Sequence, residues 1–338
     1  MILTDYFLSK PDRQWLLAKQ LGVNHATVRL PEDPSFDLTD YRQWKALSDT
    51  FLQYGIKPTV IEPVPNAIHD HIKAGDSQRD EAIEQFLKML PIMDALDIRT
   101  ICVNFMALVG WYRTTNARAD RGGALVTGFA LADCDIDPTL SISEEKLWDN
   151  LRIFLEAAVP EAERCGIRLA LHPDDPPLPR LGNVSRILTT RDALLKAIRL
   201  VPSPNLGLAL CQGCYCAMGE DIYDVIRSFL ELDKVFFVHF RDVNGCLNSF
   251  HETFHDNGPT DMARALRLYQ QYGYHGPIRV DHVPTMAGEG TTDAGYQIDG
   301  RFSMSNAGAC KPGYELEGRL FAIGYLKGLL DALGYDYI

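Results

Sequence analysis

The sequence predicts an α/β fold in which residues 1–338 form a single (β/α)8 barrel, with long loops after its strands at the C-terminal face. Eight short β-branched or apolar runs alternate with stretches of helical periodicity, as expected when helices connect parallel strands. The long irregular segments follow strands, whereas the segments that enter strands are short. The length of 338 residues suits one such barrel as well as two ordinary domains, and no obvious linker divides the chain.

Apolar runs define the eight expected strands. They are residues 2–7, 25–30, 58–64, 100–106, 168–174, 206–212, 235–242 and 277–283. The first strand is the weakest of these predictions, because Thr4 and Asp5 interrupt its apolar residues. An open, doubly wound sheet is the alternative arrangement, but no GxGxxG follows the first strand, which disfavours a dinucleotide-binding version.

Eight helices are expected between and after these strands. They are residues 11–21, 39–54, 77–96, 143–165, 189–201, 220–232, 260–272 and 318–333. Several begin after a Ser, Thr or Asp that can accept hydrogen bonds from first-turn amides, and several end at Gly. Pro91 predicts a kink or break in the third of them.

Four long segments follow strands and indicate where a site would lie. They are residues 107–142, 173–188, 243–259 and 284–317. Enzymes with a (β/α)8 barrel carry their active sites on the loops that follow strands, at the C-terminal face. Residues 284–317 are therefore predicted to form an active-site loop or lid.

Composition and charge disfavour several classes of binding partner and of cellular location. The net charge of −12 disfavours nucleic acid or an anionic membrane as a partner. No apolar run approaches the roughly 18 residues that cross a bilayer, and the N-terminus lacks the pattern of a secretory signal. The eight scattered cysteines favour reduced thiols over a disulfide scaffold. We therefore expect a soluble, cytoplasmic protein.

Side chains that can bind a metal stand at the ends of four successive predicted strands: His172, Cys211, His239 and Asp281. Each alone is weak evidence, since a single strand-end His is more often a structural hydrogen-bonding residue and a buried Cys usually packs inertly. The joint pattern is far rarer by chance, because neighbouring strand ends converge at the barrel mouth. Two imidazoles, a thiolate and a carboxylate suit a divalent metal, with Zn²⁺ or Fe²⁺ favoured by the donors themselves.

Polar residues around these four suggest an acid–base and substrate-binding shell. Arg241 could bind a carboxylate through two hydrogen bonds. Asp174 and His251 lie in two of the long segments that follow strands, residues 173–188 and 243–259. A structural role stays open for each of them: an ion pair for Arg241, a turn cap for Asp174 and an exposed loop position for His251. His282 follows Asp281, so strict strand alternation points it away from the site; it reaches the site only if the strand ends or bends there.

The stretch CQGCYC places Cys211, Cys214 and Cys216 within six residues. No second CxxC exists that would complete a four-thiolate site. We therefore expect Cys211 to be the ligand, in step with the other strand ends, and the other two cysteines to be loop residues beside it.

Several motifs together resemble the mannonate dehydratase family. They are HPDDPP (172–177), VHFRDV (238–243), SFHE (249–252), the DH pair (281–282) and PGY (312–314). NFM (104–106), WYRT (111–114) and the stretch EPVPNAIHDHIKAGDSQRDEAI (62–83) are also similar to the family. The resemblance runs from about residue 55 to the end of the chain, in the same order.

The resemblance implies a metal-dependent lyase of the xylose-isomerase-like barrel group. Such an enzyme converts D-mannonate to 2-keto-3-deoxy-D-gluconate and water in hexuronate breakdown. It implies Mn²⁺ on the same four residues, with Fe²⁺, Co²⁺, Mg²⁺ and Zn²⁺ left open, and proton transfer by His282 and Tyr314. Asn104, in the NFM motif, joins Asp174, Arg241 and His251 as an expected substrate-binding residue.

Three segments depart from the family pattern and put the particular sugar acid in doubt. They are VPTMAGEG after the DH pair, ELEGRLF after PGY, and CQGCYC itself. A metal-dependent sugar isomerase or epimerase of the same barrel group, and a catalytically silent sugar-acid binding protein, remain alternatives. The expected partner is a small-molecule sugar acid, and a homo-oligomer is left open.

Overall fold

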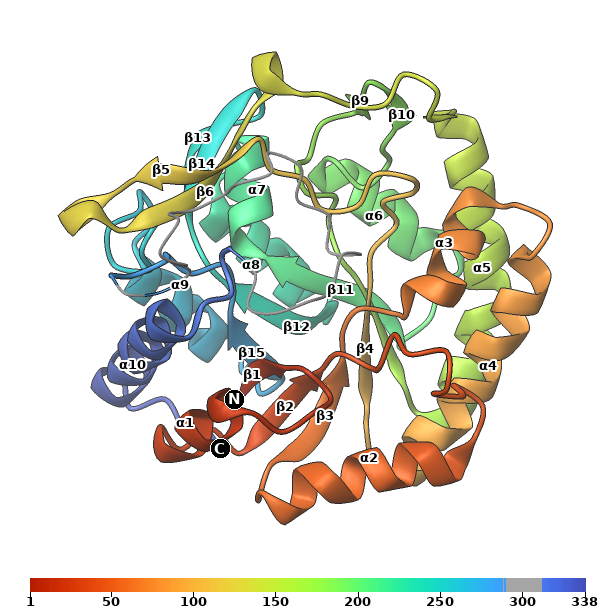
Figure 1. The fold of residues 1–338 in the computed structure, drawn as a ribbon, viewed down its shortest axis with the longest axis horizontal. Helices are drawn as coiled ribbons and strands as arrows, with labels where there is room; N and C mark the ends of the chain where they lie inside the picture. The colour runs from red at the N-terminus through yellow and green to blue at the C-terminus, as the bar shows by residue number, and fades with distance from the viewer. Residues whose placement is uncertain (288, 290–311) are drawn as a thin grey trace.

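A closed parallel barrel forms the centre of the protein (Figure 1), which confirms the predicted fold class. The computed structural model describes residues 1–287, 289 and 312–338. Around the barrel the strand order is β1-β15-β12-β11-β8-β4-β3-β2, and each strand coincides with one of the eight predicted runs. Their bounds are β1 (Ile2–Phe7), β2 (His25–Val28), β3 (Lys57–Ile61), β4 (Thr100–Val103), β8 (Arg168–Leu171), β11 (Leu206–Cys211), β12 (Val235–Phe240) and β15 (Pro277–Val280).

The first strand forms despite its polar residues, because the neighbouring strands satisfy them. The hydroxyl of Thr4 is fully buried, 3.0 Å from the Thr27 hydroxyl on β2, and donates to the Ile278 carbonyl of β15 at 3.1 Å. Asp5 accepts hydrogen bonds from the backbone amide of Tyr6 and from the side chain of Gln14. Buried polar groups that are paired in this way do not oppose strand formation.

All eight predicted helices are present. They are α1 (Arg13–Gln20), α2 (Tyr41–Gln53), α4 (Arg79–Ala95), α5 (Glu144–Cys165), α6 (Arg191–Leu200), α8 (Ile222–Glu231), α9 (Met262–Gln271) and α10 (Leu316–Ala332). α4 continues through Pro91 to Ala95, so the expectation of a break there is wrong.

Two further helices were not predicted, α3 (Asn66–Ala74) and α7 (Gln212–Met218). α3 begins directly after Pro65 and ends at Gly75, whose φ of +63° is left-handed. A side chain at Gly75 would also collide with Asn150 of α5, which donates to the Lys73 carbonyl at 2.9 Å. The Pro and Gly that bracket α3 are helix boundary signals present in the sequence.

The segments inserted after barrel strands build two small sheets. The first is antiparallel, in the order β13 (Val243–Cys246), β14 (Ser249–Glu252), β6 (Leu125–Ala130) and β5 (Thr115–Ala119). The second is β7 (Ser141–Ile142), β10 (Asn183–Ser185) and β9 (Arg180–Leu181), and short 3₁₀ turns η1 (Arg121–Gly123) and η2 (Leu131–Asp133) flank β6. In Figure 1 both sheets lie in the upper part of the view, beyond the barrel.

One irregularity interrupts the barrel ladder. β11 and β12 shift register between Leu208 and Ala209: Leu208 is opposite Val235, but Ala209 is opposite Phe237. One extra residue, Phe236, is thereby accommodated on β12, and beyond it Cys211 stands opposite His239. Both phenylalanines belong to the cluster of buried side chains with Val60, Cys102, Ala170 and Ala209.

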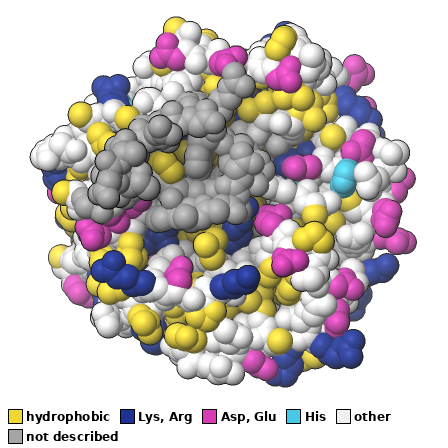
Figure 2. Space-filling model, viewed as in Figure 1, with side chains coloured by type: hydrophobic (Ala, Val, Ile, Leu, Met, Phe, Trp, Pro, Cys, Tyr) yellow, Lys and Arg dark blue, Asp and Glu magenta, His cyan; other side chains and the backbone are white. Residues whose placement is uncertain are grey.

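The surface agrees with the overall charge. On the face drawn in Figure 2, acidic and basic side chains are interspersed around the rim, and the described residues there form no continuous basic patch. Within the described ranges, no helix is both long enough and apolar enough to cross a membrane. Of the predicted lid at 284–317, residues 288 and 290–311 lie outside the described residues.

Candidate active site

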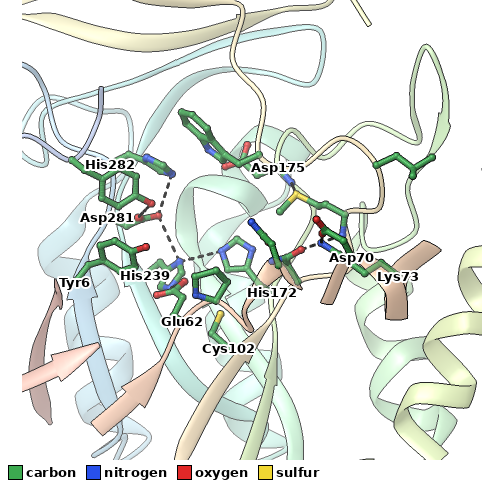
Figure 3. A pocket seen from close by; sticks show the side chains of 18 of the residues that line it. Tyr6, Glu62, Asp70, Lys73, Cys102, His172, Asp175, His239, Asp281 and His282 are labelled. Atoms are coloured by element: carbon green, nitrogen blue, oxygen red, sulfur yellow. Dashed lines mark hydrogen bonds and ion pairs between the residues drawn. The ribbon is translucent and has the colours of Figure 1, made fainter. Parts of the chain in front are cut away.

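A cavity of about 390 Å³ opens beside the C-terminal ends of the barrel strands (Figure 3). Its walls include His172, His239 and Asp281 of the predicted ligand set, and both predicted proton-transfer residues, His282 and Tyr314. α3 forms one side of the cavity, through Asn66, Asp70, Lys73 and Ala74. The unpredicted helix therefore contributes to the site's wall.

Three of the four predicted ligands meet at one point, and the fourth, Asp281, lies beside them. The ligand atoms of His172, Cys211 and His239 all lie within 4.8 Å of one another, and His172 Nε2 is 3.1 Å from His239 Nδ1. Asp281 Oδ2 lies 3.6 Å from the same His239 nitrogen. Each of the four stands at or directly after the end of its strand, which is why residues from positions 172 to 281 can meet.

Each imidazole of this group has its second nitrogen held by a neighbour. His172 Nδ1 is 2.6 Å from the carbonyl oxygen of Pro173, and His239 Nε2 is 3.0 Å from Glu62 Oε1. His172 Nε2 and His239 Nδ1 are therefore left facing the common point. Metal-binding histidines are oriented in this way, by a carbonyl or carboxylate on the far nitrogen.

Arg279, which the sequence reasoning missed, holds the carboxylates in place. Its Nε is 2.9 Å from Glu62 Oε2 and its Nη1 is 2.6 Å from Asp281 Oδ1, which leaves Asp281 Oδ2 toward the cluster. Burial favours protonated acids, but the charge of Arg279 and those of neighbouring groups, His239 among them, together outweigh burial, so the pKa of Glu62 falls to about 2 and that of Asp281 lies well below its ordinary value. Arg279 shares strand parity with Asp281, a signal that was available.

Cys211 ends β11 and directly precedes α7, so Cys214 and Cys216 are helical residues and not loop residues as expected. Burial opposes ionisation of Cys211, but the Cys214 thiol and the Arg241 charge outweigh it and hold the pKa of Cys211 well below its ordinary value. Burial and the neighbouring Cys211 sulfur raise the pKa of Cys214. Cys211 is accordingly the thiolate of the pair and Cys214 its hydrogen-bonding thiol.

His282 reaches the site because β15 ends at Val280 and His282 itself adopts φ +41°. Its Nε2 lies 3.6 Å from Asp281 Oδ2. Burial, followed by the charges of Arg241 and Arg113, lowers the pKa of His282 to about 3 against the opposing effect of Asp281. Strand alternation required β15 to end before His282 if this side chain was to face the site, and β15 does end there.

Tyr314 of the PGY motif lies on the other side of the same carboxylate. Its hydroxyl is 3.3 Å from Asp281 Oδ1, and its ring meets that of His282 edge-on at a centroid distance of 5.0 Å. Burial and the charge of Asp281 raise the pKa of Tyr314 well above its ordinary value, so the phenol keeps its proton.

Arg241 belongs to a cluster of buried charges and does not line the cavity, although its Nη1 also lies 3.6 Å from Asp281 Oδ2. Its Nη2 is 2.9 Å from Asp175 Oδ2 and its Nη1 is 3.4 Å from Glu252 Oε1. Arg113 binds the same two acids, at 2.6 Å each, and all four side chains are 1% exposed. The guanidinium is thus engaged by protein carboxylates, and the structure does not bring it to a position where it could clamp a substrate.

Of the other predicted substrate-binding residues, one lines the cavity and two do not. Asn104 lines the cavity, and its side-chain oxygen accepts from the Met106 amide. Asp174 is fully buried, accepts hydrogen bonds from the backbone amides of residues 187 and 188 at 3.0 Å, and is absent from the cavity wall. His251 is half-buried on β14, opposite Asn244 of β13, and also stays out of the cavity. Neither Asp174 nor His251 is brought to the cavity wall, and His251 lies on a strand, not in an exposed loop as its structural alternative had it.

The fold and its strand-end cluster define a parallel (β/α)8 barrel protein with potential metal-binding side chains at the C-terminal ends of its strands. A family model described as D-mannonate dehydratase (UxuA) matches residues 13–139 and 133–307. The chain belongs to the mannonate dehydratase family.

Individual relatives agree with this membership. The chain is 34% identical over 265 residues to a mannonate dehydratase of Streptococcus agalactiae serotype V, which covers 70% of this chain and 75% of that protein. It is 31% identical over 305 residues to one of Streptococcus equi subsp. zooepidemicus, with 81% and 82% covered.

Solved structures extend the comparison to the fold. The crystal structure of mannonate dehydratase from Streptococcus suis serotype 2 superposes with a TM-score of 0.84 at 27% identity, covering 99% of this chain and 95% of that one. A D-psicose 3-epimerase from Clostridium cellulolyticum H10 has a TM-score of 0.62 at 16% identity, with 98% and 99% covered. This second likeness concerns the barrel fold alone.

Proposed function

We propose that this protein is a hydro-lyase that dehydrates D-mannonate, or a closely related sugar acid, to 2-keto-3-deoxy-D-gluconate and water. The observation that carries the proposal is the group formed by His172, Cys211 and His239, with Asp281 next to His239 and with His282 and Tyr314 next to Asp281. Membership of the mannonate dehydratase family supports the choice of reaction.

The donor set fits a divalent metal ion. Two imidazole nitrogens, one thiolate and one carboxylate oxygen lie close together, and a neighbour holds the other polar atom of each imidazole and of the carboxylate. When bound, the ion would act as a Lewis acid that stabilises negative charge developing beside the substrate carboxylate. We propose Mn²⁺ because the family implies it; Fe²⁺, Co²⁺, Mg²⁺ and Zn²⁺ are the competitors, since a thiolate with imidazoles favours softer ions than Mn²⁺.

His282 and Tyr314 share the two proton transfers. Dehydration removes the C2 proton and expels the C3 hydroxyl as water; the resulting enol then becomes the 2-keto-3-deoxy acid. A buried neutral imidazole can accept a proton and a buried phenol can donate one. Both groups flank Asp281, so one substrate position lies within reach of both.

The test is turnover of D-mannonate by purified protein. We expect a 2-keto-3-deoxy product that disappears after chelation and returns when Mn²⁺ is added back, with Mg²⁺, Co²⁺, Fe²⁺ and Zn²⁺ compared in parallel. A panel of other aldonic acids identifies the preferred substrate. Full activity in chelated protein would sink the proposal.

Two other functions have distinct outcomes in the same assay. An isomerase or epimerase would take up deuterium at C2 from heavy water without losing water from the substrate. A silent sugar-acid binding protein would bind aldonic acids without converting any of them. The expected setting is hexuronate breakdown in the cytoplasm, with a small-molecule sugar acid as partner.

A further inference from the structure

We infer that Trp111 is a positioning residue that fixes the imidazole of His282 for proton transfer; the inference rests on the proposed function. Trp111 lies in the WYRT motif (111–114), is 6% exposed, and forms part of the cavity wall. Its indole stacks on the His282 ring with a centroid distance of 4.9 Å and an interplanar angle of 14°.

The His282 ring lacks the close polar contacts that the other two histidines of the site make. His282 Nδ1 has no hydrogen-bond partner among the described residues, and Nε2 is 3.6 Å from Asp281 Oδ2, beyond hydrogen-bond length. His172, in contrast, has a carbonyl oxygen 2.6 Å from its Nδ1, and His239 has a carboxylate oxygen 3.0 Å from its Nε2. Packing must therefore hold the His282 ring.

Among the residues that the structure describes, three neighbours supply that packing. Trp111 covers a face of the ring and Tyr314 meets it edge-on. Gly313, at φ +89°, stands at Nδ1, where an added Cβ would come within 3.2 Å. Of these contacts only the indole is parallel to the imidazole, so it is the one that resists rotation of the ring out of its plane. Nε2 is left directed toward Asp281 and the cavity.

The buried ion cluster holds the indole in turn. The Arg113 guanidinium carbon lies 4.5 Å from the Trp111 ring centroid. That guanidinium is fixed by Asp175 through two hydrogen bonds of 2.6 and 2.9 Å and by Glu252 through one of 2.6 Å. The cluster contains none of the predicted ligands, and Arg113 places one of its charges against the indole; a second link to the site runs from Arg241 Nη1 to Asp281 Oδ2, at 3.6 Å.

The test compares Trp111→Ala, Trp111→Phe and a matched control, Trp148→Ala. Trp148 lies on α5 with Lys196 Nζ 3.6 Å from its ring centroid, so it also carries a cation over its ring, but it is remote from the cavity wall. The measurements are kcat and KM with D-mannonate, deuterium uptake at C2, bound metal, and the rate at which diethyl pyrocarbonate labels His282, read by peptide mass spectrometry.

We expect Trp111→Ala to lower kcat about 100-fold, the cost of misplacing a reacting group by roughly 1 Å, with KM changed less than about threefold. Metal content should stay at the wild-type level, and His282 should be labelled faster. Trp111→Phe should recover most of kcat because phenylalanine keeps a flat stacking face. Trp148→Ala should match the wild type in every measurement.

Three results would overturn the inference: an unchanged kcat in Trp111→Ala, a loss of metal in that variant, or a Phe variant no better than the Ala variant. If the wild type released no 2-keto-3-deoxy product, the proposed function would fall. C2 exchange and His282 labelling would then still decide the positioning role, because neither depends on net loss of water.

Discussion

Two groups of buried charged residues lie next to each other at the mouth of the barrel, and they differ in where their polar atoms point. In the strand-end cluster, His172, His239 and Asp281 each have one polar atom held by the protein and one directed to a shared point. In the cluster of Arg113, Asp175, Arg241 and Glu252, cations and carboxylates pair mainly with one another, although Arg241 Nη1 also lies 3.6 Å from Asp281 Oδ2. Metal-binding atoms that face one shared point, rather than buried charge as such, mark the candidate metal site.

The largest effect expected from this comparison is at Cys211. Removing a metal ligand should cost more than the 10- to 100-fold that loss of a neighbouring orienting group costs, so Cys211→Ser should lower metal affinity by more than about 100-fold and abolish turnover. Cys214→Ser is the matched control, because Cys214 hydrogen-bonds to Cys211 without joining the group of ligand atoms. Metal analysis of both proteins is the measurement; equal metal loss in the two would restore a cysteine-cluster site.

Breaking the cluster of Arg113, Asp175, Arg241 and Glu252 should lower the stability of the fold. Arg241→Met leaves Asp175 and Glu252 with one guanidinium in place of two, and removing one partner of a buried pair costs about 3–5 kcal/mol in the free energy of unfolding. The control is Arg152→Met on α5, an exposed pair with Glu156, where a change below about 1 kcal/mol is expected. Urea denaturation measures both, and an Arg241→Met protein as stable as the wild type would show that the cluster does not hold the fold together.

A smaller effect should appear in the pH dependence of stability. Burial raises the pKa of Glu252 from 4.5 to about 7, against the Arg241 and Arg113 charges. The folded protein thus holds this proton more tightly than the unfolded chain, so Glu252 lowers the free energy of unfolding as pH rises from 4.5 to about 7.

Glu252→Gln removes that titration. The stability difference, variant minus wild type, should therefore increase with pH across this window and level off above it. Urea denaturation at several pH values measures it, and a difference independent of pH would contradict the assignment.

The smallest effect is expected at His251. Its ring is half-buried on β14 and does not line the cavity, so His251→Ala should leave kcat/KM for D-mannonate within about twofold, as for surface changes remote from a site. A large loss would place the β13–β14 hairpin in contact with substrate.

The sequence could predict much of this arrangement. Cys211 and His239 were found because each ends a β-branched or apolar run, and such runs identify strands whatever surrounds them. His282 could not be settled, because the positive φ that redirects it is a single backbone choice with no periodic signature. α7 was missed because CQGCYC offers little helix signal around Gly213.

The partners of Arg241 were out of reach for a different reason. Arg113 and Glu252, which share its cluster, are 139 positions apart, and only the closed fold brings them together. A clamp for substrate and a member of a buried ion cluster look alike in the sequence, since both need an arginine beside acids after a strand. Exposure separates the two, and exposure is a property of the fold.

The register shift between β11 and β12 has a consequence for how this site could be rebuilt. With Leu208 opposite Val235, an uninterrupted ladder would set Cys211 opposite Val238 and turn the His239 imidazole to the outer wall. The extra residue, Phe236, shifts the register of β12 by one position, and this shift places the Cys211 thiolate and the His239 imidazole on the same face of the barrel wall. A design that moves these ligands onto a barrel with regular strands must therefore either delete one residue from the strand that carries the histidine or reproduce the register shift. The motif sequence alone would place the histidine on the wrong face of the strand.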